Sequence, residues 1–204
     1  MPSRNIIKEY VSDSYYHVYA RGVSKQKIFH DAQDYHYFYK ILSRYLSKKQ
    51  AFSRTGESYP HFHDRISLVA YCLMTNHFHL LIHQKDADDL QKFMRSVMTS
   101  YSRYFNLRHK RSGPVFESRY KASRINSGQY LEHITRYIHL NPRRWESYYN
   151  SSLRHYRGDN TPPEWLTIAP VMNLFTSSED YLQFVADYEE MRDMMAELKY
   201  QLAD

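Results

Sequence analysis

The sequence predicts an α+β protein with a ferredoxin-like βαββαβ sandwich, in which two helices cover one face of an antiparallel sheet. Apolar and polar residues alternate in several short segments, which is typical of strands. In longer segments the apolar residues recur every three or four positions, which is typical of helices. The segments follow the order strand, helix, strand, strand, helix, strand, and this order favours the split βαβ arrangement.

The first half of the chain supplies a strand, a helix and a second strand. Residues 15–21 alternate in polarity and are expected to form the first strand. Asp31 is a suitable N-cap for a helix that reaches about Lys49. A polar stretch with glycine and proline is expected as a loop, and residues 66–74 follow as the second strand.

The next segment completes the expected sandwich. A tight Thr75-Asn76 turn joins the second strand to a third strand over residues 77–84. A helix is expected over residues 90–107, capped by a preceding aspartate. Residues 116–125 are expected to form the fourth strand.

A third helix and a C-terminal extension follow the sandwich. Ser127 is a candidate cap for the third helix, which is expected to end at Asn141-Pro142. The sequence character changes afterwards, so we expect a catalytic domain over residues 1–145 and an extension over residues 146–204. The extension is expected to hold a turn-rich linker over residues 154–163 and an acidic helix capped by Ser178.

Composition excludes several classes of protein. The single cysteine, Cys72, excludes an internal disulfide and a cysteine-rich zinc site. No apolar run approaches the roughly 18 residues that a membrane span needs. The N-terminal residues lack an apolar signal segment, so a cytoplasmic location without membrane attachment is expected.

Basic residues concentrate in the middle of the chain. Between Lys92 and Trp145 there are 12 Lys/Arg and only 2 acidic residues, whereas the remainder holds 16 basic and 20 acidic residues. This segment also contains many aromatic residues, a combination that favours nucleic-acid binding over a merely solvated basic face. The expected nucleic-acid contacts are Arg21, Arg103, Arg108, Lys110, Arg111, Arg119, Lys121, Arg124, Arg143 and Arg144.

Two histidines stand in the expected third strand. Alternate residues of a strand share a face, so His77 and His79 should point the same way while Phe78 points into the core. Two adjacent imidazoles on a rigid element are a potential pair of metal ligands. A pair of ordinary strand histidines is the alternative interpretation.

Tyr137 and Asn141 lie four residues apart and therefore share a face of the third helix. A tyrosine hydroxyl beside a metal site can attack a phosphodiester. The asparagine carboxamide is a suitable third ligand for a divalent ion held by two imidazoles. The alternatives are a core aromatic at Tyr137 and a C-cap before Pro142 at Asn141.

These motifs carry a resemblance to a known family. His77-Phe78-His79 resembles the paired-histidine motif of the HUH endonucleases, and Tyr137-Ile138-His139-Leu140-Asn141-Pro142 resembles the nucleophile helix of their single-tyrosine branch. His17-Val18-Tyr19-Ala20-Arg21-Gly22-Val23 and Gly113-Pro114-Val115-Phe116 are similar to segments of IS200-like and REP-associated tyrosine transposases. The segments follow the family order over roughly residues 15–145.

The resemblance implies an enzyme that cleaves and rejoins DNA. His77, His79 and Asn141 would hold Mg²⁺ or Mn²⁺, and Tyr137 would form a 5′-phosphotyrosine link on single-stranded or hairpin DNA, in a monomer or a homodimer. Asn141 departs from the glutamine common in the insertion-sequence branch, and Glu117 stands where glutamine is expected. Two other functions stay open: a non-catalytic module that binds nucleic-acid hairpins, and a metal-dependent hydrolase without a covalent step.

Overall fold

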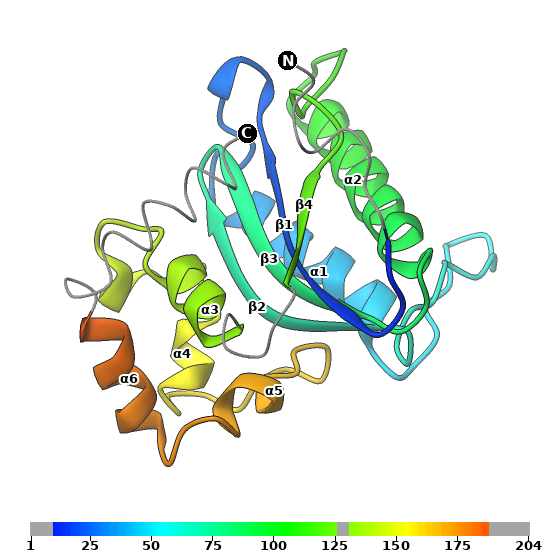
Figure 1. Ribbon diagram of the computed structural model, residues 1–204. Helices are drawn as coiled ribbons and strands as arrows, with labels where there is room; N and C mark the ends of the chain where they lie inside the picture. The colour runs from blue at the N-terminus through cyan, green and yellow to red at the C-terminus, as the bar shows by residue number, and fades with distance from the viewer. Residues whose placement is uncertain (1–9, 126–130, 188–204) are drawn as a thin grey trace, which may run out of the picture.

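The computed structural model describes residues 10–125 and 131–187, which form a layered α/β structure around one sheet (Figure 1). The sheet contains four antiparallel strands in the order β2-β3-β1-β4. The strands are β1 (Ser14–Arg21), β2 (Ile66–Met74), β3 (His77–Gln84) and β4 (Lys121–Ile125). This order and the helices between the strands confirm the expected ferredoxin-like sandwich.

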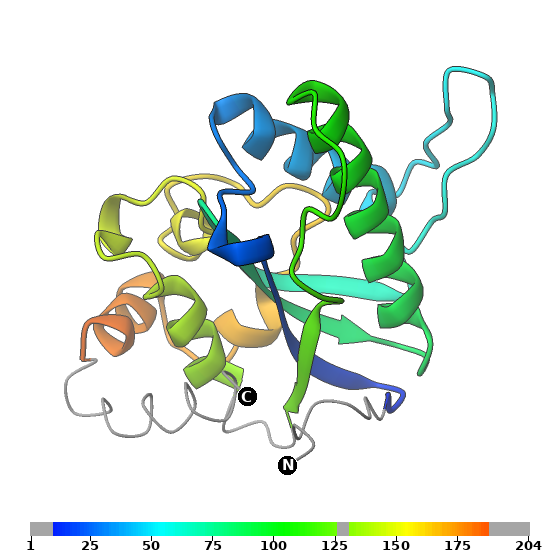
Figure 2. The ribbon, with the colours of Figure 1, turned by 90° about the horizontal axis from the view of Figure 1, so that it is seen from above.

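Helices α1 (Ala32–Leu46) and α2 (Asp89–Arg108) cover one face of the sheet (Figures 1 and 2). We call the packed layer between these two helices and the sheet the first core. The Asp31 carboxylate caps α1 by accepting hydrogen bonds from the backbone N–H groups of Gln33 and Asp34. Apolar residues at helical spacing on both helices pack against alternate residues of the strands, such as Val18 and Phe78.

On the opposite face of the sheet lie α3 (Leu131–His139), α4 (Leu153–Tyr156) and α5 (Ala169–Met172), and α6 (Ser178–Ala186) packs against α3. We call this contact the second core. It includes Val69, Ala70, Cys72 and Leu81 of the sheet. Short 3₁₀ helices occur at Val23–Lys25 and Trp145–Ser147.

A β-bulge in β2 explains which residues of that strand face the second core. Leu68 pairs with Ile82 and Ala70 pairs with Leu81, so Val69 is an extra residue in the ladder. The extra residue reverses the alternation, because Leu68 lies in the first core whereas Ala70 lies in the second.

Several expected boundaries were wrong. The fourth strand begins at Lys121 rather than at residue 116, because Tyr19 pairs with Lys121 while Gly22 bridges to Phe116. Gly22 is three residues after Tyr19, whereas Phe116 is five residues before Lys121. The regular pairing of β1 with β4 is therefore interrupted between these two contacts.

The remaining differences lie at helix ends. Helix α1 ends at Leu46 instead of about residue 49, and α4 occupies the start of the expected linker. The last helix is capped by Ser177 rather than Ser178, and the described part of this helix ends at Ala186. The expected cap Ser127 and the end of the acidic helix lie outside the described residues. No helix in the described ranges is long and apolar enough to span a bilayer.

Candidate active site

The two histidines of β3 lie on the face of the sheet that α3 covers. His77 pairs with Arg21 and His79 pairs with Tyr19 across the β1–β3 ladder. Phe78, between them, lies fully buried in the first core. The alternation of the strand therefore separates a packing residue from two imidazoles on the other face, as expected.

The carboxamide of Asn141 lies between the two imidazoles. Its Oδ1 is 3.1 Å from His77 Nε2, and its Nδ2 is 3.2 Å from His79 Nε2. Helix α3 ends at His139, and the chain continues for one turn through a hydrogen bond from Asn141 N–H to the carbonyl of Ile138. The end of α3 thus places one amide group against both histidines.

A third histidine, His17 of β1, orients His79. His17 is fully buried, and its Nε2 lies 2.9 Å from His79 Nδ1. If Asn141 Nδ2 donates to His79 Nε2, the proton of the neutral His79 ring is on Nδ1 and is donated to His17. His17 then carries its own proton on Nδ1, for which the described residues contain no hydrogen-bond partner.

Burial keeps the imidazoles of the site neutral. It lowers the pKa of His79 well below its ordinary value, with further lowering by His17, His77 and Arg21. Burial also lowers the pKa of His77, partly opposed by its hydrogen bond to Asn141, and lowers the pKa of His17 to about 3. Neutral imidazoles retain the nitrogen lone pairs that a cation requires.

Tyr137 of α3 packs directly against this group. Its ring meets the rings of His79 and His17 edge to face, with centroids 5.6 and 5.7 Å apart. The residue is 8% exposed, so it lies at the margin of the buried cluster. The structure therefore brings together all four residues that the sequence singled out for this site: His77, His79, Tyr137 and Asn141.

The donor set fits a divalent cation. Within the described ranges, no group of three or more His, Cys, Asp or Glu side chains could hold a metal ion. The Nε2 atoms of His77 and His79 both face the Asn141 carboxamide, however, so two neutral imidazoles and one amide group supply uncharged N and O donors side by side. Such N and O donors suit a divalent ion that keeps other positions for water or a phosphate oxygen.

His17 was not among the site residues expected from the sequence. Its role depends on a contact between two strands, which residue types alone do not reveal. The available signal was the alternation of β1, which places His17 and Tyr19 on the face opposite the apolar Val18.

The basic residues expected to bind nucleic acid have different environments. Arg21 stands beside the histidine pair, and Arg103, Arg119 and Lys121 line one groove. Arg108 instead pairs with Asp31 and the buried Asp34, which ties α2 to the start of α1. Arg111 donates to the carbonyl of Pro114. The exposed side chains of the expected set include Lys110, Arg124, Arg143 and Arg144.

A family comparison defines the class of protein, namely a DNA-processing enzyme of the transposase type. The model of the family "Transposase IS200 like" matches residues 10–141, which is most of the described structure. The chain belongs to the IS200-like transposase family.

A solved structure supports the same fold. The structure of a REP-associated tyrosine transposase bound to a REP hairpin is similar with a TM-score of 0.56. The similarity covers 79% of this chain and 89% of that chain, at 12% sequence identity. A comparison with curated protein sequences gives no match.

Proposed function

We propose that this transposase cleaves single-stranded DNA by a tyrosine nucleophile and rejoins it through a covalent intermediate. The observation that carries the proposal is the position of the Asn141 carboxamide between His77 Nε2 and His79 Nε2, with the Tyr137 ring against His79. Binding alone does not require this combination.

Tyr137 supplies the nucleophile. Its phenolic oxygen forms a bond to the phosphorus of the DNA backbone while the bond from phosphorus to the 3′ oxygen breaks. The phenol loses its proton, and the leaving oxygen gains one to become a free 3′-OH. The product is a 5′-phosphotyrosine link, which a 3′-OH from another strand reverses without an external energy source.

His77, His79 and Asn141 would hold Mg²⁺ or Mn²⁺. When bound, the ion supplies charge that offsets the negative charge of the phosphate in the transition state. Neighbouring residues hold these side chains in position. His17 orients the ring of His79, and the turn after α3 positions the carboxamide of Asn141.

The substrate class follows from the charge of the molecule and from its likeness to other proteins. The basic middle segment favours a polyanion, and the similar solved structure holds a REP hairpin. We therefore propose hairpin-flanked, single-stranded DNA as the substrate. Tyr137 packs against His79 of its own chain, so we propose that the tyrosine acts in cis.

A covalent adduct tests the proposal. Labelled single-stranded DNA with a hairpin, incubated with the protein and Mn²⁺, should give a DNA–protein adduct that survives denaturing electrophoresis. Tyr137→Phe should abolish the adduct because no hydroxyl remains to attack the phosphate. Tyr149→Phe, which alters a side chain that is 69% exposed, should leave the adduct unchanged.

The other outcomes separate the competing functions. Cleavage that persists in Tyr137→Phe would identify a hydrolase without a covalent step. Binding without cleavage in Mg²⁺ and in Mn²⁺ would identify a hairpin-binding module. Either result would overturn the proposal.

A further inference from the structure

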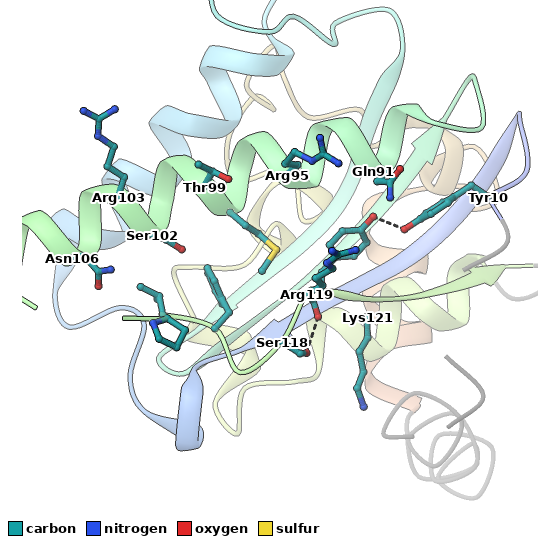
Figure 3. Close-up of a pocket in the computed structure, with 15 residues that line it drawn as sticks. Tyr10, Gln91, Arg95, Thr99, Ser102, Arg103, Asn106, Ser118, Arg119 and Lys121 are labelled. Atoms are coloured by element: carbon teal, nitrogen blue, oxygen red, sulfur yellow. Dashed lines mark hydrogen bonds between the residues drawn. The ribbon is translucent and has the colours of Figure 1, made fainter. Parts of the chain in front are cut away.

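A concave surface lies on the side of the molecule where α2 faces the segment that leads into β4 (Figure 3). We call it the α2 groove. It has a volume of about 1120 Å³, and none of the four proposed active-site residues lines it. Its walls come from α2, from residues 114–116 and 118–121, and from Tyr10.

The two walls of the α2 groove are polar, whereas the base is apolar. Arg95, Thr99, Ser102 and Arg103 line the groove from α2, and Arg119 lines it from the segment before β4 (Figure 3). The apolar side chains that line the groove are Met98, Pro114, Val115 and Phe116 together with the rings of Tyr10 and Tyr120. The arrangement therefore offers cations at the rim and flat apolar surface between them.

The charge of the α2 groove has one sign. Its lining includes Arg95, Arg103, Arg119 and Lys121 and no aspartate or glutamate. Over residues 10–125 and 131–187, no carboxylate forms an ion pair with any of the three arginines. Arg108 on the same helix differs, because it forms ion pairs with Asp31 and Asp34. The three arginines of the groove can therefore form ion pairs with an external anion.

One end of the α2 groove leads toward the candidate active site. The Lys121 ammonium lies 5.6 Å from the centroid of the Tyr19 ring. That ring stacks on His79, with centroids 5.7 Å apart and planes 25° apart. Strand β4 forms the edge of the described sheet, and only β1 lies between it and β3, which carries His77 and His79.

We propose that the α2 groove binds an unpaired segment of the DNA strand that is cleaved, next to the scissile phosphate. The arginines neutralise successive phosphates, and the apolar base accommodates the faces of unstacked bases. A duplex presents phosphates and groove edges but no free base faces, so it would leave the apolar base of the groove unused. The nature of the ligand as DNA rests on the proposed function.

Removing the three arginine charges tests the proposal. The triple variant Arg95→Gln, Arg103→Gln, Arg119→Gln and the wild type are titrated with labelled hairpin DNA, with and without a single-stranded tail, in EDTA so that no cleavage occurs. The tail should increase the affinity of the wild type roughly tenfold or more, and the variant should lose this increase. For the tailed DNA, the slope of log affinity against log salt should fall by about 2, from about 0.7 for each of three phosphates.

A matched control removes the same charge elsewhere. Lys40→Gln, Lys49→Gln, Arg54→Gln changes three exposed residues outside the groove, and its tail-dependent gain should equal that of the wild type. A steric variant tests the groove without a change of charge. Thr99→Trp should place a bulky ring in the groove and reduce the tail-dependent gain, whereas Thr55→Trp, in an exposed loop, should not.

Two results would overturn the proposal. One is an equal loss of affinity for tailed and tailless hairpins in the groove variant, because the groove would then bind duplex. The other is an equal loss of the tail-dependent gain in the groove and control variants, because the effect would then be general electrostatics.

Neither result depends on the covalent adduct. An adduct that forms normally while the groove variant binds the tail like the wild type would sink the groove proposal alone. A groove-dependent tail effect without an adduct from the wild type would sink the proposed cleavage alone.

Discussion

The two faces of the sheet are packed by different chemistry. The first core joins the sheet to α1 and α2 almost entirely through aliphatic and aromatic side chains, among them Phe38, Phe78 and Tyr101. The second core contains fewer such residues and includes buried polar side chains, notably His17, His79, Arg136 and His139. Both faces bury titratable groups, but the first pairs its buried Asp34 and Asp89 with arginines, whereas the second buries histidines that face one another and a tyrosine.

A chain of hydrogen bonds links the second core to the helix that carries Tyr137. His139 Nδ1 lies 2.6 Å from the Tyr181 hydroxyl of α6, and His139 Nε2 lies 2.8 Å from Ser152 Oγ. Arg136 places its guanidinium over the Phe184 ring, 4.3 Å from the centroid. The C-terminal helices thus hold α3 by directional contacts. The first core therefore mainly stabilises the fold, whereas the second core also fixes the position of α3.

The largest expected effect comes from adjacent residues of β3 that face opposite cores. Phe78→Ala should lower the free energy of unfolding by about 3–5 kcal/mol, because it opens a cavity in the first core. His79→Gln should cost less, about 1–3 kcal/mol, because it disturbs the hydrogen bonds to His17 and Asn141. Urea unfolding measures both values.

For metal affinity, the larger loss should come from His79→Gln rather than from Phe78→Ala. Calorimetric titration with Mn²⁺ should show lost binding for His79→Gln, and near-normal binding for the folded fraction of Phe78→Ala. Equal Mn²⁺ affinity in His79→Gln and the wild type would contradict the assigned ligand role.

An acid-induced loss of stability should arise from the second core. Burial lowers the pKa of His139 to about 3, and its ring faces Tyr181, Tyr156 and Ser152, of which the two tyrosines have raised pKa values. The unfolded state binds a proton near pH 6.5 whereas the folded state does not. The contribution is therefore present above pH 6.5 and is lost as the pH falls toward 3.

The magnitude at pH 5 is about 2 kcal/mol for each such histidine. Urea unfolding at pH 7 and pH 5, in EDTA, measures it, and the wild type should lose about 2 kcal/mol more than His139→Leu does. An identical pH dependence in the two proteins would show that His139 is not protonated differently on unfolding.

The smallest expected effect concerns the hydroxyl that bonds to His139. Tyr181→Phe should lower the free energy of unfolding by about 1 kcal/mol, because His139 Nδ1 loses its partner. The same change should cost less in a His139→Leu background, where no such bond exists. Additive costs in this double-mutant cycle would mean that the bond does not stabilise the fold.

Much of the sheet could be predicted because its signals are local. Alternation and a two-residue turn locate β2 and β3, and helical spacing places Tyr137 and Asn141 on one face. The structure brings those two residues to the histidine pair, while their chemical roles remain predictions.

The features that the sequence did not predict depend on contacts between distant segments. The bulge at Val69 is visible only once β2 is paired with β3, and the early start expected for β4 failed because Gly22 and Phe116 bridge out of register. His17 acts through a neighbouring strand, and the α2 groove exists only where α2 faces Arg119. Residue types along the chain carry no direct record of such pairings.

The turn after α3 also has a chemical consequence for the lifetime of the protein. Asparagine usually converts to aspartate when the backbone nitrogen of the next residue attacks the side-chain carbonyl and closes a succinimide ring. Asn141 is followed by the buried Pro142, whose nitrogen carries no hydrogen and does not close that ring. The amide between His77 and His79 is therefore protected against spontaneous ageing into a carboxylate.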